Sequence, residues 1–149
     1  MTGSPIVGRV GRDASTAEFL DGTASGVLLL QECLRCGGID EPQSGQCGRC
    51  GSTERRRRPA AGRATVVSWS VLHSRSEEGI VRIPIAIGEL EEGPWWWSQV
   101  AGAEPDDLAI GAPLVLDFAR AGDETVPVFR LAPVAADAEV PHCSGRSTA

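Results

Sequence analysis

The sequence repeats one short pattern twice: Cys33-Leu34-Arg35-Cys36-Gly37 and Cys47-Gly48-Arg49-Cys50-Gly51. In each copy two residues separate the cysteines, a spacing that lets both sulfurs face one point. Four converging thiolates are the ligand set of a tetrahedral structural metal site. The glycine after each pair takes the positive φ of a tight turn at little cost. The repeat therefore predicts a metal site formed by Cys33, Cys36, Cys47 and Cys50.

The cysteine spacing also limits what this site can do. Redox Cys-x-x-Cys motifs occur singly, and disulfide scaffolds are usually shorter secreted chains, so a metal is the better interpretation. Zinc and iron both accept four thiolates, and a rubredoxin-type iron carrier remains an alternative. We expect structural Zn²⁺, because the rest of the chain offers no redox partner chemistry. With four cysteine ligands no coordination position is left open for substrate, so the site is predicted to stabilise the fold and not to catalyse.

Composition excludes several classes of protein. The chain has 149 residues, of which 42% are hydrophobic, enough for one compact domain of about 100 residues plus a small metal module. No apolar run approaches the length of a membrane span, and the first residues lack the pattern of a signal peptide. Together with reduced thiolate ligands, these features predict a cytoplasmic protein. A net charge of −6 argues against a protein that mainly binds nucleic acid.

The side chains used in catalysis are scarce. All 14 basic residues are arginine and tyrosine is absent, so neither a Schiff-base lysine nor a tyrosine acid is available. The histidines are His73 and His142. His142 adjoins the fifth cysteine, Cys143, but neighbours in a terminal tail usually point apart. We therefore predict that the chain has no catalytic residues of its own.

One basic cluster stands out in this acidic chain. Arg55, Arg56, Arg57 and Arg58 follow the second cysteine pair directly, and Arg63 lies close behind. A solvated loop is one interpretation of such a run. A site for phosphates, such as those of coenzyme A, is the other, because arginine recognises phosphate well.

The chain before the cysteines predicts a docking helix. Ser15 and Glu18 match a capping box, followed by the apolar Phe19 and Leu20. A short helix from about Ser15 to Thr23 cannot fold in isolation, so it must dock on something, and a partner chain is one candidate. A strand from Val27 to Gln31 then leads into the first cysteine pair.

The second half reads as a small barrel. Five strand candidates follow Pro59, near residues 64–72, 80–90, 95–100, 114–118 and 126–131, with a helical turn at 104–108. Alternation places Val67, Trp69 and Val71 on one face of the first strand, and Val81, Ile83, Ile85 and Ile87 on one face of the second. This pattern predicts a mainly β chain: an N-terminal helical segment (1–26), a four-cysteine ribbon (27–58), a five-stranded OB-fold (59–133) and a disordered tail (134–149).

Three consecutive tryptophans form the third of these strands. On a strand, Trp95 and Trp97 share a face and Trp96 takes the opposite one. One face is predicted to be barrel core, since tryptophan buries a large area. The opposite face cannot also be core in a small barrel. At least one indole is therefore expected at the surface, where aromatic anchors mark interfaces or acyl pockets.

Several of these segments, in this order, resemble a known family, the domain of unknown function thirty-five. The resemblance covers about residues 19–133 and rests on Phe19-Leu20-Asp21-Gly22, both cysteine pairs, Gly62-Arg63-Ala64-Thr65-Val66, Glu91-Glu92-Gly93, Leu108-Ala109-Ile110-Gly111 and Pro127-Val128-Phe129-Arg130. The chain departs from the family at the arginine run and at the three tryptophans. The resemblance implies a rubredoxin-like zinc ribbon joined to an acyl-CoA-associated OB-fold.

The same resemblance implies a function. Members are similar to small accessory subunits of thiolase-superfamily enzymes, which include thiolases, aldolases and ketosynthase-like acyltransferases. We therefore expect a hetero-oligomer in which this chain helps present coenzyme A thioesters, with Phe19, Leu20 and Trp95 to Trp97 at an interface or acyl pocket and Arg55 to Arg58 and Arg63 near a ligand. The alternative is a single-stranded nucleic-acid-binding protein, because OB barrels and zinc ribbons both serve that role. The acidic Glu89, Glu91 and Glu92 near the tryptophans disfavour it.

Overall fold

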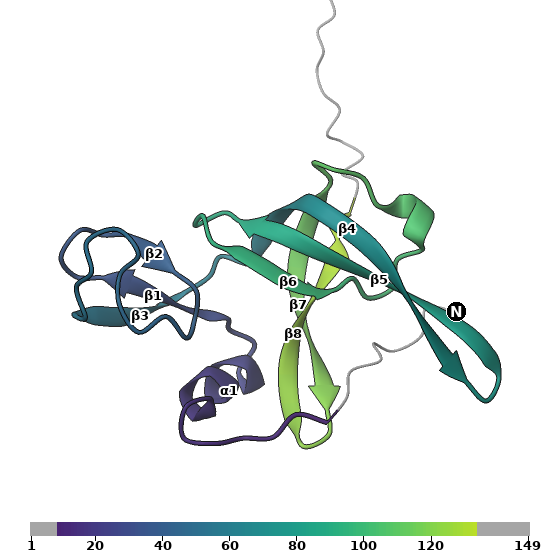
Figure 1. Cartoon of the computed structure of the whole chain (residues 1–149), viewed down its shortest axis with the longest axis horizontal. Helices are drawn as coiled ribbons and strands as arrows, with labels where there is room; N and C mark the ends of the chain where they lie inside the picture. The colour runs from purple at the N-terminus through teal and green to yellow at the C-terminus, as the bar shows by residue number, and fades with distance from the viewer. Residues whose placement is uncertain (1–8, 134–149) are drawn as a thin grey trace, which may run out of the picture.

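The computed structural model describes residues 9–133, and these form two β units joined by a short connection (Figure 1). The predicted disordered tail, with His142 and Cys143, lies outside these residues. Among residues 9–133 no helix has the length and apolar character needed to cross a bilayer. The elements are α1 (Ala17–Ala24), β1 (Leu29–Cys33), β2 (Ile39–Asp40), β3 (Arg55–Pro59), β4 (Arg63–Ser76), β5 (Gly79–Leu90), β6 (Trp95–Gln99), the 3₁₀ turn η1 (Pro105–Asp107), β7 (Pro113–Ala121) and β8 (Glu124–Leu131).

Helix α1 begins two residues later than predicted, and the capping box is wrong. The N-cap is Thr16, which makes no side-chain cap hydrogen bond, and Asp13 stabilises the turn before it. The Asp13 Oδ1 accepts hydrogen bonds from the N–H groups of Ser15 and Thr16, both at 2.9 Å, while the Asp13 N–H donates to Thr16 Oγ1 at 3.0 Å. Glu18 is therefore free to pair with Arg57.

The helix docks on its own chain. Leu20 and Thr23 are buried, and the Thr23 hydroxyl donates a 2.6 Å hydrogen bond to the carbonyl of Thr125 on β8. Leu20, which the sequence analysis placed at an interface or acyl pocket, has a side chain that is 2% exposed within its own chain. Phe19, one residue earlier, lies on the side of α1 that is only partly buried.

The cysteine unit is a three-stranded antiparallel sheet in the order β2-β1-β3. The strand before the first cysteine pair starts at Leu29, two residues later than predicted, and it ends at Cys33. Leu28 and Leu30 are buried in the same core as the barrel residues. The ribbon and the barrel therefore share apolar packing.

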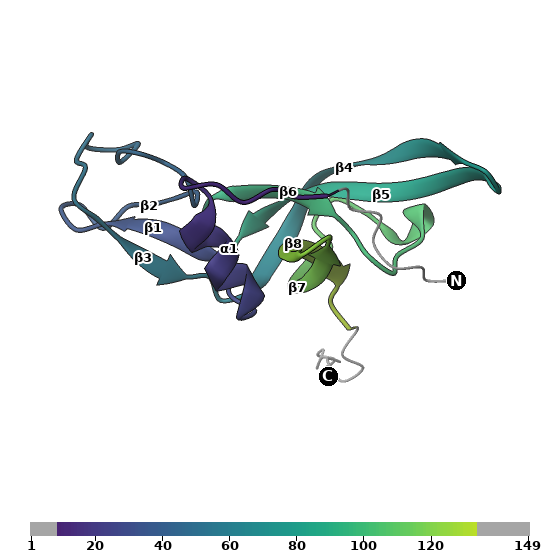
Figure 2. The same ribbon diagram turned by 90° about the horizontal axis from the view of Figure 1, so that it is seen from below.

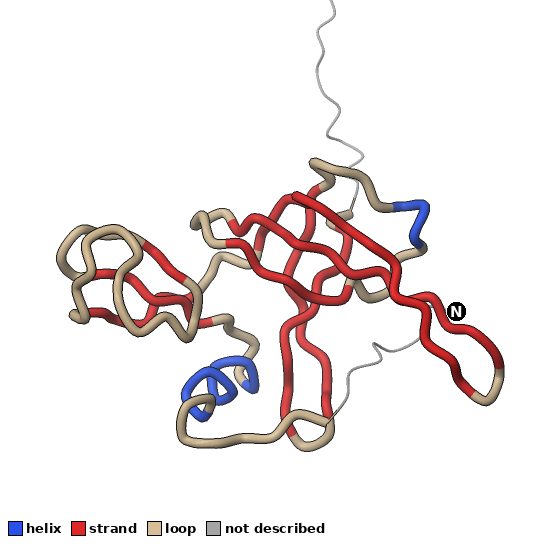
Figure 3. Tube along the Cα trace, viewed as in Figure 1, coloured by secondary structure: helices blue, strands red, loops and turns tan. Residues whose placement is uncertain are grey.

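The barrel contains the five predicted strands in the order β6-β5-β4-β7-β8. Val100, directly after β6, forms a parallel bridge with Phe129 of β8, which brings the two edge strands together. The predicted helical turn is present as η1. This is the OB-fold that the sequence predicted, viewed from two sides in Figures 1 and 2 and traced by secondary structure in Figure 3.

Phe129 is the centre of the barrel core. Its side chain is 0% exposed, and its ring lies over Gly88 of β5, where an added Cβ would come within 2.8 Å of Phe129 Cζ. Glycine at position 88 therefore makes room for the largest buried side chain. Ala64, Val66, Ala86 and Leu90 complete this part of the core.

A β-bulge between Val66 and Ser68 changes the alternation on β4. Trp69 and Val71 share a face as predicted, but Val67 is the extra residue of the bulge. On β5 the core face is Ala86, Gly88 and Leu90. The isoleucines that alternation had grouped together lie on the opposite face, where Ile83 is buried and Ile85 and Ile87 are partly buried.

Candidate functional site

The two cysteine pairs fold into nearly identical turns. The N–H of Gly37 donates to the Cys33 carbonyl at 3.0 Å, and that of Gly51 donates to the Cys47 carbonyl at 2.9 Å. Both glycines have positive φ, 79° and 76°, as the sequence predicted. Each turn directs two sulfurs toward the other turn.

The four sulfurs form one cluster. Cys33 Sγ lies 3.6 Å from Cys50 Sγ, Cys36 Sγ lies 3.5 Å from Cys47 Sγ, and all four fall within 4.8 Å of one another. Tetrahedral zinc with bonds of about 2.3 Å places its sulfurs about 3.8 Å apart, so the cluster has the right size for an ion. Cys33, Cys36, Cys47 and Cys50 can together hold a metal ion.

Backbone N–H groups that donate to the cysteine sulfurs stabilise negative charge in the cluster. The N–H groups of Cys36 and Arg35 donate to Cys33 Sγ and lower the pKa of that thiol to about 6. Those of Cys50 and Arg49 lower the pKa of Cys47. The Gly38 N–H acts to lower the pKa of Cys36 as well, but the neighbouring thiols and burial raise it to about 11. Four thiolates this close need a cation to ionise together.

The arginine run forms a strand, so the interpretation of this run as a solvated loop is wrong. It forms β3, paired antiparallel with β1, with Arg55 opposite Cys33 and Arg58 opposite Leu30. Strand residues alternate in direction, so neighbouring arginines reach different partners. The run therefore lies across the ribbon, between the metal cluster and α1.

Arg55 is part of the ribbon's structure. Its side chain is 7% exposed, and its guanidinium contacts Asp40 Oδ2 at 2.9 Å and donates to the Ser44 carbonyl at 3.2 Å. Asp40 in turn accepts from the Gly48 N–H at 3.3 Å. Arg55 thus ties the loop between the cysteine pairs to β3, and it is not available to an external phosphate.

Replacing Arg55 should destabilise the ribbon. In Arg55→Ala, the partly buried Asp40 carboxylate loses its counter-charge and the packing of the buried Arg55 side chain is lost, which we expect to cost about 2 kcal/mol of unfolding free energy. Chemical denaturation of the metal-loaded protein measures this. Arg56→Ala, at a neighbour with a 63% exposed side chain, should cost less than about 1 kcal/mol, and equal losses for the two variants would contradict the structural role of Arg55.

The remaining arginines of the run are paired but exposed. Arg56 and Arg58 contact the two carboxylate oxygens of Glu32 at 3.0 and 3.5 Å, and Arg57 pairs with Glu18 of α1. These contacts hold the pKa values of Glu32 and Glu18 below their usual range. Arg63 is paired with Glu91 at 2.7 Å. A phosphate at any of these arginines would have to compete with a carboxylate.

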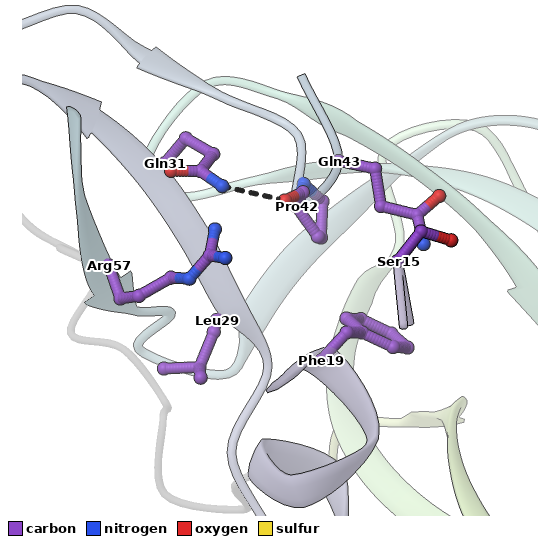
Figure 4. A pocket seen from close by; sticks show the side chains of 7 residues that line it. All are labelled: Ser15, Phe19, Leu29, Gln31, Pro42, Gln43 and Arg57. Atoms are coloured by element: carbon purple, nitrogen blue, oxygen red, sulfur yellow. Dashed lines mark hydrogen bonds between the residues drawn. The ribbon is translucent and has the colours of Figure 1, made fainter. Parts of the chain in front are cut away.

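A cavity of about 390 Å³ lies between α1 and the ribbon. Figure 4 shows its lining, with Phe19 from α1 opposite Gln31 and Arg57 from the ribbon strands. Gln31 Nε2 donates to the Pro42 carbonyl at 2.9 Å, which fixes the loop on the far wall. The full lining is Ser15, Phe19, Leu29, Gln31, Pro42, Gln43 and Arg57.

An aromatic pair separates this cavity from the barrel. The rings of Phe19 and Trp96 lie 5.9 Å apart, and Trp96 packs against the shared core. A second hollow of about 240 Å³ is lined by Phe19, Trp96, Glu41, Pro42 and Gln43. The Trp96 Nε1 is buried and has no hydrogen-bond partner among the described residues.

The other two tryptophans lie on the opposite side of the sheet. Trp95 and Trp97 are 58% and 67% exposed, so the prediction that one tryptophan face is at the surface is confirmed. They pair across the strands with Glu89 and Ile87. Because directly opposite residues share a face, Ile85 and Ile87 extend this apolar outer surface along β5.

Sequence reasoning brought Phe19, Trp96 and Arg57 forward as separate candidates. The fold brings Trp96 and Phe19 to the smaller hollow and Phe19 and Arg57 to the larger cavity. Sequence reasoning missed Gln31, Pro42 and Gln43, which line the larger cavity. Gln31 is a polar residue directly after an apolar run (Val27 to Leu30), and it is buried. A polar residue at the end of such an apolar strand is the feature that could have identified it. The loop residues carry no comparable pattern.

Comparison with known proteins places this architecture in a family. Residues 57–119 match the model of the ChsH2 C-terminal OB-fold domain. The structure of an Ltp2-ChsH2(DUF35) aldolase contains a chain that is 30% identical, with a TM-score of 0.72 over 83% of this chain and 98% of that one. DUF35 is the abbreviation for the domain of unknown function thirty-five.

Two sequence relatives differ in how much of them this chain covers. A DUF35 domain-containing scaffold protein from Methanothermobacter thermautotrophicus is 32% identical over 65% of this chain and 75% of its own length. A probable enoyl-CoA hydratase alpha subunit from Thermomonospora curvata is 36% identical over 69% of this chain, which spans only 33% of that relative. With its four-cysteine ribbon followed by a matching OB-fold, the chain belongs to the DUF35 family.

Proposed function

We propose that this chain is a non-catalytic scaffold subunit that binds a thiolase-like enzyme, whether a thiolase, an aldolase or a ketosynthase-like acyltransferase. The observation that carries the proposal is the 30% identity to a chain of an Ltp2-ChsH2(DUF35) aldolase, 98% of which is covered. The scaffold name of the Methanothermobacter relative supports the same role. The hydratase relative is matched over only 33% of its length, so its named activity gives no ground for assigning hydration to this chain.

The metal in this proposal is structural zinc. Four thiolates within 4.8 Å of one another suit Zn²⁺ and fill its coordination sphere. Zinc bound there would neutralise the sulfur cluster and hold the two cysteine turns together. No position would remain for substrate, in keeping with a supporting role.

The ligand in this proposal is an acyl-CoA thioester presented at the complex. The cavity beside Phe19 has an apolar wall and a guanidinium at its rim. The candidates for binding the phosphates are the arginines with exposed side chains, Arg56, Arg57, Arg58 and Arg63. Arg55 is not a candidate, because its side chain is buried. A phosphate would replace Glu18, Glu32 or Glu91 as their partner.

The double variant Arg57→Ala/Arg58→Ala should weaken binding of acetyl-CoA to the assembled complex by about tenfold, through loss of charge-assisted hydrogen bonds. Isothermal titration calorimetry of the complex measures the affinity. Arg120→Ala, at an exposed arginine of β7, is the matched control and should leave affinity unchanged. Unchanged affinity in the double variant would remove these arginines from the ligand site.

Single-stranded nucleic-acid binding is the second candidate, because Trp95 and Trp97 are exposed side by side on an OB-fold sheet. Stacking platforms of this kind bind bases, but they normally lie in a positive groove. Glu89 shares the face with both indoles, and the chain carries a net charge of −6. Scaffolding is therefore the better-supported function.

A turnover assay tests the non-catalytic role. The chain purified alone is expected to have no thiolase, aldolase or acyltransferase activity on acyl-CoA substrates, since thiolase-like chemistry is assigned to the partner. The partner enzyme should gain activity when this chain is added in equal amounts. Robust turnover by the isolated chain would overturn the proposal.

A further inference from the structure

The hairpin of β4 and β5 extends beyond the barrel. β7 pairs with β4 only at Arg63 to Thr65, and β6 pairs with β5 only from Ile85 to Glu89. Residues 71–84 are here called the arm. Its base is covered, since the Val100 N–H donates to the Pro84 carbonyl at 2.9 Å and Ile83 and Pro84 are buried. From there to the tip the two strands have no third strand from residues 9–133 beside them, and Figures 1 and 2 show them projecting from the barrel. A two-stranded hairpin is only marginally stable in water unless a face is covered.

The arm exposes apolar side chains on both faces. Val71, His73 and Arg75 of β4 lie opposite Pro84, Arg82 and Ile80 of β5 on one face. Leu72 and Ser74 lie opposite Ile83 and Val81 on the other. Ile80 is 65% exposed and Leu72 is 53% exposed, one on each face. A partner that covers the arm must therefore contact both sides of it.

The charged residues are distributed unevenly over the arm. Arg75 and Arg82 are exposed and are among the six arginines of residues 9–133 without an ion pair there, the others being Arg9, Arg35, Arg49 and Arg120. The paired set is Arg12, Arg55, Arg56, Arg57, Arg58, Arg63 and Arg130. Arg75 and Arg82 lie on the same face of the arm, which concentrates positive charge on that face. Glu77 and Glu78 occupy the turn at the tip and have no ion pair with these arginines.

We propose that the arm is the element that docks into the partner enzyme, in a groove with an acidic wall facing Arg75 and Arg82, an apolar wall facing Leu72, and a basic end facing Glu77 and Glu78. This inference rests on the proposed function. A second copy of the chain is a poorer occupant, because two chains of net charge −6 repel each other at long range. Nucleic acid would meet the two glutamates at the tip.

The experiment is affinity purification of the tagged full-length chain from its native host, comparing wild type, Arg75→Glu/Arg82→Glu and the control Arg120→Glu. The charge reversal should reduce recovery of the thiolase-like chain by about tenfold or more at low salt, because like charges then meet in the groove. The control should match wild type. A photo-crosslinking residue at Leu72 should link to an apolar segment of the enzyme, and one at the 69% exposed Ile110 should not.

The outcomes separate the two proposals. Equal recovery by wild type and the arm variant overturns the arm as docking element and leaves the scaffold function standing. Failure of wild type to recover any thiolase-like chain overturns both. Crosslinks from Leu72 to a second copy or to nucleic acid also overturn the arm proposal. Metal content and the melting temperature of the arm variant should equal those of wild type, since both substitutions are at exposed side chains.

Discussion

A Cys36→Ser chain is expected to lose its metal and the folded structure of its ribbon. Structural zinc in four-ligand sites contributes about 10–16 kcal/mol of apparent binding free energy, far more than the small β2-β1-β3 sheet can replace. Cys36 Sγ lies 3.5 Å from Cys47 Sγ, so its loss opens the cluster. Elemental analysis gives the metal content, and amide hydrogen exchange of β1 to β3 reports the fold.

Cys143→Ser makes the same chemical change outside the two cysteine turns. This control should bind the metal as wild type does. A Cys36→Ser protein that keeps a stoichiometric metal ion and a protected ribbon would contradict the assignment of four cysteine ligands.

Phe129→Ala is expected to have the largest effect on the barrel, about 4 kcal/mol of unfolding free energy. The ring is 0% exposed and lies directly over Gly88. Gly88 has no side chain that could move into the vacated space, so a cavity remains. Urea denaturation of the metal-loaded protein measures the loss.

Phe118→Ala is the matched control, because Phe118 on β7 is only partly buried. It should cost less than about 2 kcal/mol. Similar losses for the two phenylalanines would mean that Phe129 does not organise the core.

The metal cluster and the five strands could be predicted because each depends on local sequence. Two cysteines at fixed spacing followed by glycine specify a turn whatever surrounds them, and the structure gives the two glycines the expected positive φ. The strands can be recognised in a similar way, because turn residues mark where each one begins and ends. The OB order followed from the number of strands and the helical turn between the third and fourth.

What failed depends on contacts between distant residues. The arginine run has no strand pattern, and it becomes β3 because β1 supplies its hydrogen bonds and Glu32 and Glu18 supply its counter-charges. The helix prediction began at Ser15, but Asp13 holds Ser15 and Thr16 in a turn before the helix, and the sequence alone does not rank this turn against a capping box. The bulge after Val66 shifted the faces of β4, and no local signal announces it.

The role of the tryptophans was predictable in part. Alternation separated Trp96 from its neighbours, and Trp96 does pack inward beside Phe19. Which face would be core depended on the barrel's curvature and on Phe129, which lies more than thirty residues later. The cavity beside Phe19 was invisible for the same reason, since its walls come from α1, two ribbon strands and a loop.

Mass spectrometry of the proteins recovered with the tagged chain from its native host, with zinc measured in the same eluate, tests the central claim most directly. The account predicts a thiolase-like enzyme chain in nearly equal amount, together with stoichiometric zinc. Recovery of nucleic acid with no such enzyme would contradict it and would favour the nucleic-acid role of the OB-fold.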